Sequence, residues 1–257
     1  MIALGLVAGT AGGVAVVAAG ASDEADPAPP RAAALTASAR PALSIPAPRG
    51  LDDGPGLTRW AHVRHAVAAR AGPGRARRVV ARVAGSTPEG TVTALPVTGR
   101  RTSRHGRLWM RVVLPVLANG TSGWVPRRAL GAYEVSHHRL IVDLGRERLT
   151  LLDRGRVVLR APIGVGQSRW PTPRGTFLVR NRLVRYASPQ YGPVAFGTSA
   201  RSPTLTDWPA GGFIGIHGTD RPDLVPGRIS HGCVRLRNPD MLRLARLMPV
   251  GTPVEIR

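Results

Sequence analysis

The single cysteine of this 257-residue chain lies among groups that could make it a nucleophile. Cys233 is part of the run Ser-His-Gly-Cys-Val-Arg at 230–235, and His217 lies 16 residues before it. The thiolate is the reactive form of cysteine, and a nearby imidazole can take the thiol proton. Gly232 permits a tight turn whose backbone N–H groups could receive a developing oxyanion. The pattern predicts a Cys/His nucleophilic site, with His231 as a second imidazole.

Two other interpretations of these residues are open. A metal site could use His217, His231, Cys233 and Asp220, but His-x-Cys is not a usual zinc spacing and the sequence has no second thiol. A buried thiol beside two hydrogen-bonded histidines is the purely structural alternative, and composition alone favours it. The closeness of two His-Gly pairs to the one cysteine favours catalysis.

Short β-prone runs separated by turns must position these residues. In the first half the runs are 79–83, 91–95, 108–114 and 123–126. In the second half they are 139–144, 148–152, 156–163 and 253–256. The dipeptide Asn119-Gly120 is a hairpin signal. One helix is predicted over 239–248, with Asn238 as its cap and Pro239 at its first position. The fold class is therefore mainly β.

Composition divides the chain into four predicted parts. Residues 1–21 contain no charged side chain and are mostly apolar, which is typical of a signal peptide or membrane anchor. Residues 22–57 are rich in Pro and Ala and predict an extended linker. Residues 58–131 predict a small barrel, because the Leu-Trp-x-Arg-Val hairpin closed by Gly-Trp-Val-Pro resembles bacterial SH3-like domains. Residues 132–257 predict a second β-rich domain that carries the cysteine and the helix.

All 36 basic residues are arginine, against 15 acidic residues, which gives a net charge of +21. The absence of lysine excludes a phosphate-binding P-loop, a pyridoxal-phosphate Schiff base and the Ser-x-x-Lys nucleophile. Aromatic residues make up 4% of the chain, which argues against a base-stacking platform and nucleic-acid binding. The excess charge is spread over both halves. It indicates either a solvated basic surface or attraction to an anionic cell-wall polymer.

Residues 217–235 consist of His217, a loop and then Ser-His-Gly-Cys-x-Arg. This pattern resembles the signature of L,D-transpeptidases, enzymes that cross-link peptidoglycan with a cysteine nucleophile. The segment 170–177, which contains Pro-Thr-Pro-Arg-Gly, is similar to another motif of that family, and 163–166 extends the similarity upstream. The resemblance covers about residues 133–257. It implies an L,D-transpeptidase-type catalytic domain with one C-terminal helix, preceded by the SH3-like barrel.

The resemblance also implies roles for individual residues. Cys233 attacks the carbonyl before the terminal D-alanine of a stem tetrapeptide, His217 takes the thiol proton, and His231 supports proton transfer or positions the thiolate. Backbone N–H groups at Gly232 and Cys233 hold the oxyanion, and Arg235 binds a substrate carboxylate or braces the loop. The expected catalytic residues are thus Cys233, His217, His231 and Gly232. The candidate substrate-binding residues are Arg235, Ser230, Gly218, Thr219, Tyr191 and Trp208. Neither a cofactor nor a metal is implied.

Some questions stay open at this point. Gly218 occupies a position where the family often has Ser or Asp, so either the Gly218 carbonyl or Asp220 must orient His217. An L,D-carboxypeptidase acting on the same donor is one alternative function, and a non-catalytic wall-binding protein is another. Expected partners are peptidoglycan stem peptides and possible anionic wall polymers, without nucleic acid. We expect export to the cell envelope, with membrane contact only through the N-terminal segment.

Overall fold

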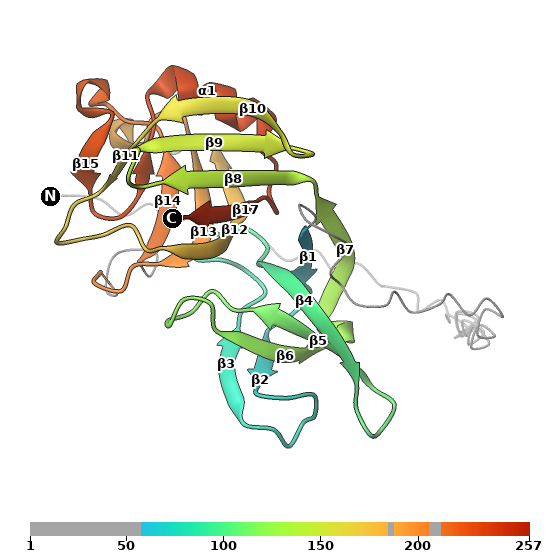
Figure 1. Ribbon diagram of the computed structural model, residues 1–257. Helices are drawn as coiled ribbons and strands as arrows, with labels where there is room; N and C mark the ends of the chain where they lie inside the picture. The colour runs from blue at the N-terminus through green and yellow to red at the C-terminus, as the bar shows by residue number, and fades with distance from the viewer. Residues whose placement is uncertain (1–57, 185–187, 206–211) are drawn as a thin grey trace, which may run out of the picture. The chain divides into compact units, whose positions relative to one another are not determined.

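The computed structural model describes residues 58–184, 188–205 and 212–257 (Figure 1). The predicted signal segment and linker lie outside these residues. The prediction of a mainly β fold is confirmed, because strands form two sheets and the described residues contain one α-helix. In the described part of the chain, no helix is long and apolar enough to cross a membrane.

Seven strands form the N-terminal sheet, in the order β3-β2-β6-β5-β4-β1-β7. Their bounds are β1 (Thr58–Val63), β2 (Val67–Arg70), β3 (Val79–Val83), β4 (Ala94–Thr102), β5 (Leu108–Val113), β6 (Ser122–Pro126) and β7 (Leu130–Ser136). Leu95, Met110 and Leu130 belong to the buried cluster of this sheet. β7 pairs with β1, so the sheet continues past residue 131, where the predicted barrel ends. An SH3-like architecture stays a prediction.

The predicted strands of the first half correspond to β3, β5 and β6 within one residue at either end. The run 91–95 differs, because β4 begins at Ala94 and Val92 forms only an isolated bridge with Ser86. Residues 85–91 instead form a turn that returns to the sheet.

Ten strands form the C-terminal sheet, in the order β10-β9-β8-β17-β12-β13-β14-β16-β11-β15. Their bounds are β8 (His138–Asp143), β9 (Arg148–Asp153), β10 (Arg156–Pro162), β11 (Gly164–Gly166), β12 (Gly175–Val184), β13 (Val194–Arg201), β14 (Phe213–His217), β15 (Gly227–Ser230), β16 (Val234–Arg235) and β17 (Pro253–Ile256). Short 3-10 helices are η1 (Arg127–Ala129), η2 (Pro189–Tyr191) and η4 (Pro222–Leu224). The predicted meander at 139–163 is confirmed as β8, β9 and β10, which pair in sequence.

The helix α1 (Asn238–Leu247) packs against β10 and β13 (Figure 1) and buries Met241 and Leu244. The prediction that Asn238 caps it is wrong. Arg237 is at the N-cap position, no side chain caps the helix, and Asn238 is already helical. The Asn238 side chain has a tertiary partner instead, because its Oδ1 accepts a hydrogen bond from the Thr219 N–H at 3.0 Å.

Strand pairing brings the two halves of the sequence motif together. β14 is antiparallel to β13 and parallel to β16, and the β14–β16 register places His217 opposite Arg235. Cys233 directly precedes β16, so the same parallel register brings it level with Gly215, two residues before His217 on β14. The loop with η4 and β15 accounts for the 16-residue spacing between the two residues.

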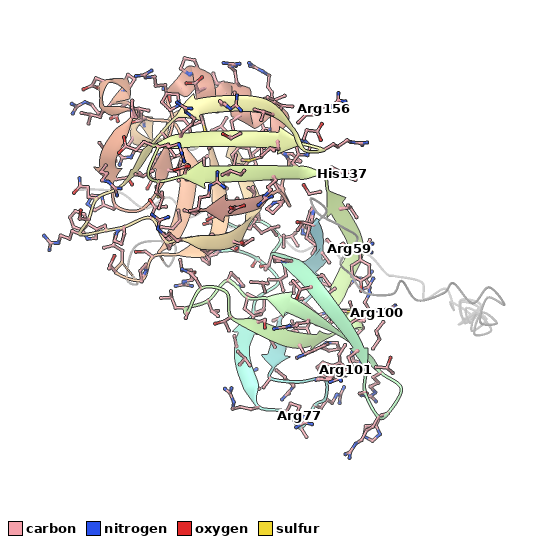
Figure 2. The ribbon with its side chains drawn as sticks, in the orientation of Figure 1. Arg59, Arg77, Arg100, Arg101, His137 and Arg156 are labelled. Carbon is pink, nitrogen blue, oxygen red and sulfur yellow. The ribbon has the colours of Figure 1, made fainter. Side chains whose placement is uncertain are left out.

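Arginines are distributed over both sheets. Figure 2 labels Arg59 on β1, Arg100 and Arg101 on β4, and Arg156 on β10. The positive charge therefore does not form one basic tail within the described residues.

Candidate active site

Cys233 lies half-buried in the turn between β15 and β16. The N–H of Gly215 on β14 donates a hydrogen bond to its Sγ at 3.3 Å. A cleft of about 250 Å³ opens over the sulfur, and Cys233 shares its lining with His217, His231 and Arg235. Gly215 could not be predicted from the sequence, because a backbone donor leaves no side-chain signal.

The turn that carries the cysteine is braced from within. The buried Ser230 hydroxyl donates to the Cys233 carbonyl at 2.6 Å and accepts from the Gly232 N–H at 3.1 Å. Gly232 has a φ of 114°, a conformation that residues with a side chain rarely adopt. Ser230 therefore holds the loop, and the Gly232 N–H is already engaged.

A second brace comes from the Pro-Thr-Pro segment. The Thr172 hydroxyl donates to the Gly232 carbonyl at 2.8 Å and accepts from the Gly166 N–H at 2.9 Å. Thr172 is buried, so both backbone groups depend on this one hydroxyl. The family resemblance identifies this segment in the sequence, but it does not indicate the role of Thr172.

Thr172→Val should therefore destabilise the protein, because it leaves a buried N–H and a buried carbonyl without a partner. We expect a loss of about 1–3 kcal/mol in the free energy of unfolding, measured by urea denaturation. Thr172→Ser keeps the hydroxyl and is the matched control, with a smaller loss. Equal losses in the two variants would contradict the role of the hydroxyl.

His217 is 2% exposed, and its Nδ1 lies 2.6 Å from the Gly218 carbonyl oxygen. A carbonyl can only accept, so Nδ1 carries the proton and the lone pair of the neutral ring is on Nε2. Of the two orienting groups left open by the sequence, the geometry places the Gly218 carbonyl on the ring, whereas Asp220 is exposed. The Tyr191 ring packs on the other side of His217, with ring centroids 4.5 Å apart.

Gly218 is required by its neighbours. A Cβ at this position would lie 2.2 Å from Asn238 Oδ1 and 3.0 Å from the Cα of Gly192. Both distances are too short for ordinary contacts, and one of the two neighbours is backbone. The small residue thus lets the 218 backbone approach Asn238 and Gly192 while its carbonyl holds His217.

Gly218→Ala is expected to displace that carbonyl and to lower the free energy of unfolding by about 1–3 kcal/mol. A thermal or urea melt measures the loss. Gly145→Ala is the matched control, since a Cβ there would meet only Asp143 Oδ1 at 3.6 Å, an ordinary contact. If both alanines cost the same, the packing argument for Gly218 is wrong.

The imidazole of His217 and the sulfur of Cys233 both border Gly215. A Cβ placed on Gly215 would be 3.6 Å from His217 Cδ2 and 3.7 Å from Cys233 Sγ. Because residue 215 is glycine, it places no side chain of its own against these two groups. The arrangement has the components of a nucleophile beside its base.

Burial sets the protonation states of this pair. It raises the pKa of the Cys233 thiol above its usual value, against the opposing effects of the Gly215 N–H and the Arg235 charge. Burial also lowers the pKa of His217 to about 4, and the Arg235 charge acts in the same direction. At neutral pH the pair therefore rests as a thiol and a neutral imidazole. Proton transfer must accompany nucleophilic attack.

His231 and Arg235 form other parts of the cleft. His231 is exposed and stacks on Trp170, with ring centroids 4.1 Å apart. Arg235 is half-buried, and its Nε is buried without a hydrogen-bond partner among the described residues. Its guanidinium charge is felt by both His217 and Cys233. An anionic group in the cleft could meet this charge.

The remaining sequence candidates divide into two groups. Tyr191 lines the cleft with the reactive pair. Thr219 is 1% exposed and binds its neighbours, since its N–H donates to Asn238 and its hydroxyl accepts from the Arg221 N–H at 3.0 Å. Ser230 and Gly218 are not among the residues that line the cleft, and they act on it through the Cys233 turn and the His217 ring. Trp208 lies outside the described residues.

The sequence left a metal site at His217, His231, Cys233 and Asp220 as an alternative interpretation. No group of three or more His, Cys, Asp or Glu side chains in residues 58–184, 188–205 and 212–257 is arranged to hold a metal ion.

Comparison with known proteins gives consistent matches for the second half of the chain. The model of the L,D-transpeptidase catalytic domain family matches residues 137–256. Among curated proteins, the putative L,D-transpeptidase YkuD of Bacillus subtilis is 34% identical over 124 residues, which cover 48% of this chain and 68% of that protein. The protein of the same name from Bacillus licheniformis is 36% identical over 119 residues, covering 46% of this chain and 65% of its own length.

Two solved structures are also similar. An L,D-transpeptidase from Mycobacterium tuberculosis has a TM-score of 0.41 and 16% identity, covering 64% of this chain and 90% of that chain. The catalytic domain of the Enterococcus faecium L,D-transpeptidase has a TM-score of 0.35 and 26% identity, covering 46% of this chain and 95% of that chain. The chain thus spans less than two thirds of the B. licheniformis relative, and the matched region of the family model begins after β7.

Proposed function

Because this chain belongs to the L,D-transpeptidase family, we propose that it forms peptidoglycan cross-links through an acyl-enzyme on Cys233. The observation that carries the proposal is the presence of a half-buried thiol and a neutral histidine in one cleft, both bordering Gly215. The Nδ1–H of that histidine is held by the Gly218 carbonyl, which leaves Nε2 free to accept a proton. Both groups line one cleft with Arg235 and Tyr191.

The first step forms a thioester. His217 Nε2 takes the thiol proton while Cys233 Sγ attacks the carbonyl carbon before the terminal D-alanine of a stem tetrapeptide. We assign the oxyanion to the backbone N–H of Cys233, because that of Gly232 already donates to Ser230. The peptide C–N bond then breaks, the imidazolium gives its proton to the leaving amine, and D-alanine departs.

The second step releases the acyl group. An amine from a neighbouring stem peptide attacks the thioester carbonyl, the C–S bond breaks, and the proton of the amine returns to the thiolate by way of His217. The chain has no lysine, so the amine must come from the substrate. With water in place of the amine, the same thioester would give an L,D-carboxypeptidase.

The other residues of the cleft receive supporting roles in this proposal. Arg235 binds a substrate carboxylate, since a guanidinium matches carboxylate geometry. His231 supports proton transfer from the rim, and Tyr191 holds one face of His217 and contacts the peptide. Ser230, Thr219 and Gly218 act by shaping the loop and the backbone around the reactive pair.

We place this activity outside the cytoplasm, where peptidoglycan is assembled, and residues 1–21 would direct the export. The barrel predicted at 58–131 and the distributed arginines would favour contact with anionic wall polymers.

Product analysis tests the proposal. The protein is incubated with a stem tetrapeptide, with and without a diamino-acid acceptor peptide, and the products are identified by mass spectrometry. A cross-linked dimer that requires the acceptor supports the transpeptidase, and a tripeptide alone supports the carboxypeptidase. Binding to wall fragments without either product would favour the wall-binding protein instead.

A further inference from the structure

The N-terminal sheet supplies one carboxylate to the cleft. Between Asp53 and Glu134 the sequence contains 14 arginines and a single acidic residue, Glu89. The ion-pair partner of this carboxylate belongs to the other sheet: it is Arg180 of β12, with Arg180 Nη2 2.5 Å from Glu89 Oε1. Glu89 and Arg180 both line the cleft that contains Cys233.

The turn that presents Glu89 is preorganised. The Gly90 N–H donates to the Thr87 carbonyl at 2.9 Å, and the Thr87 N–H donates to the Thr91 carbonyl at 2.7 Å. Pro88 occupies the second position of this four-residue turn, and Gly90 takes a φ of 79° at the fourth. The backbone that carries Glu89 is therefore held by hydrogen bonds within the turn itself.

The receiving strand has an irregularity at this place. The β12–β13 register shifts between Val179 and Asn181, so Arg180 is an extra residue on β12. Such a bulge re-aims side chains, and here two neighbouring residues both reach Glu89. Asn181 Nδ2 donates to Glu89 Oε2 at 3.1 Å, while Arg180 Nε donates to the Thr198 carbonyl at 3.0 Å.

Arg180 is also a structural part of the cleft. Its side chain is 3% exposed, and its guanidinium carbon lies 3.8 Å from the centre of the Phe213 ring. Phe213 lines the cleft as well. Burial acts to raise the pKa of Glu89, but the charge and hydrogen bond of Arg180 outweigh it and the pKa is lowered. The pair is therefore ionised at neutral pH.

We propose that Glu89 is a positioning residue for the peptide substrate: it holds and neutralises Arg180, so that the N-terminal sheet completes one wall of the cleft. This rests on the function proposed above. The Glu89 carboxylate neutralises Arg180. A substrate carboxylate is then directed to Arg235, whose guanidinium charge acts on the thiol. Without Glu89, the buried charge of Arg180 would loosen the Phe213 wall and compete with Arg235 for the carboxylate.

Protection of Cys233 against alkylation measures substrate binding without requiring turnover. The rate of modification by iodoacetamide is followed by intact mass over a titration of a stem tetrapeptide. In Glu89→Gln, the peptide concentration for half-protection should rise about tenfold or more. The rate without peptide should stay within about twofold, because the hydrogen bonds to Sγ and to the His217 ring come from Gly215 and Gly218. Glu134→Gln, an exposed acid of the same sheet, is the matched control and should change neither value.

A second variant separates positioning from general loss of structure. Adding Arg180→Met to Glu89→Gln removes the unpaired charge and should restore most of the protection. If Glu89→Gln alone does not fold, Arg180→Met is compared with the double variant, and equal protection is expected because Glu89 acts through Arg180. Unchanged protection in Glu89→Gln, or a further loss in the double variant, would overturn the inference. Absence of protection in the unmutated protein would instead overturn the proposed function.

Discussion

Replacing Cys233 by alanine is expected to abolish acyl transfer from a stem tetrapeptide, with a rate loss on the order of 10⁴-fold or more. The reason is that the first step forms a C–S bond to Sγ and the second step breaks it. Cys233 is the only cysteine in the chain. The sulfur is half-buried and accepts one hydrogen bond, so its removal leaves a small vacancy rather than an unpaired charge. Release of D-alanine, followed by mass spectrometry, measures the effect.

The fold should survive this change. The turn is held by Ser230 and Thr172, whose hydrogen bonds go to backbone groups that alanine retains. We therefore expect a cooperative melt close to that of the unmutated protein and retained binding of the tetrapeptide. D-alanine release by a folded Cys233→Ala variant at an undiminished rate would contradict the assignment of the nucleophile.

Replacing His217 by asparagine has the second largest expected effect, a loss of about 10²–10⁴-fold in kcat/KM. Asparagine can still donate an N–H toward the Gly218 carbonyl, but it cannot accept a proton from the thiol. Alkylation of Cys233 by iodoacetamide near neutral pH should slow as well. His65 is an exposed histidine in the turn between β1 and β2, so His65→Asn is the control and should leave both rates unchanged.

The pH dependence of kcat/KM follows from the lowered pKa of His217 and the raised pKa of Cys233. The neutral imidazole is the base, and the pKa of His217 is lowered to about 4, so kcat/KM should fall only as the pH drops toward 4. An acid limb near 6.5, the value of an unperturbed histidine, would show that burial does not act on His217 as described. The raised pKa of Cys233 predicts that no thiolate forms before attack, so the profile should have no alkaline rise below the usual thiol range.

The lowered pKa of His217 also makes the free energy of unfolding depend on pH. Between pH 6.5 and about 4 the unfolded chain binds a proton at His217 and the folded protein does not. The stabilisation is therefore present above pH 6.5 and is lost as the pH falls through this window, by about 3 kcal/mol in total. His217→Asn should lose this part of the pH dependence. An unchanged dependence in the variant would assign it to other groups.

Cys233 and His217 could be proposed from the sequence as a nucleophile and its base because the signal is local. One cysteine beside a histidine and a glycine, with another histidine 16 residues upstream, is a short pattern, and strand pairing then makes His217 and Arg235 neighbours. The mainly β fold could be predicted for the same reason, since short apolar runs and turn residues mark β8, β9 and β10 directly. These features depend on residues close in sequence.

The supporting contacts could not be predicted, because their partners are far apart in the chain or belong to the backbone. Asn238 has the sequence context of a helix cap, yet a tertiary N–H from Thr219 occupies its oxygen. The Gly218 carbonyl that orients His217 has no side chain to indicate it. Glu89 gave one usable signal, a single acid in an arginine-rich span, but its partner Arg180 is 91 residues away.

The central claim is that Cys233 forms a thioester with a stem peptide, and intact mass spectrometry after rapid quenching at acidic pH tests it most directly. The expected result is a mass increase equal to the tetrapeptide minus D-alanine, localised to Cys233 after proteolysis and lost when an acceptor amine is added before the quench. Release of D-alanine with no adduct on Cys233 at any quench time, or an adduct located on another residue, would contradict the account.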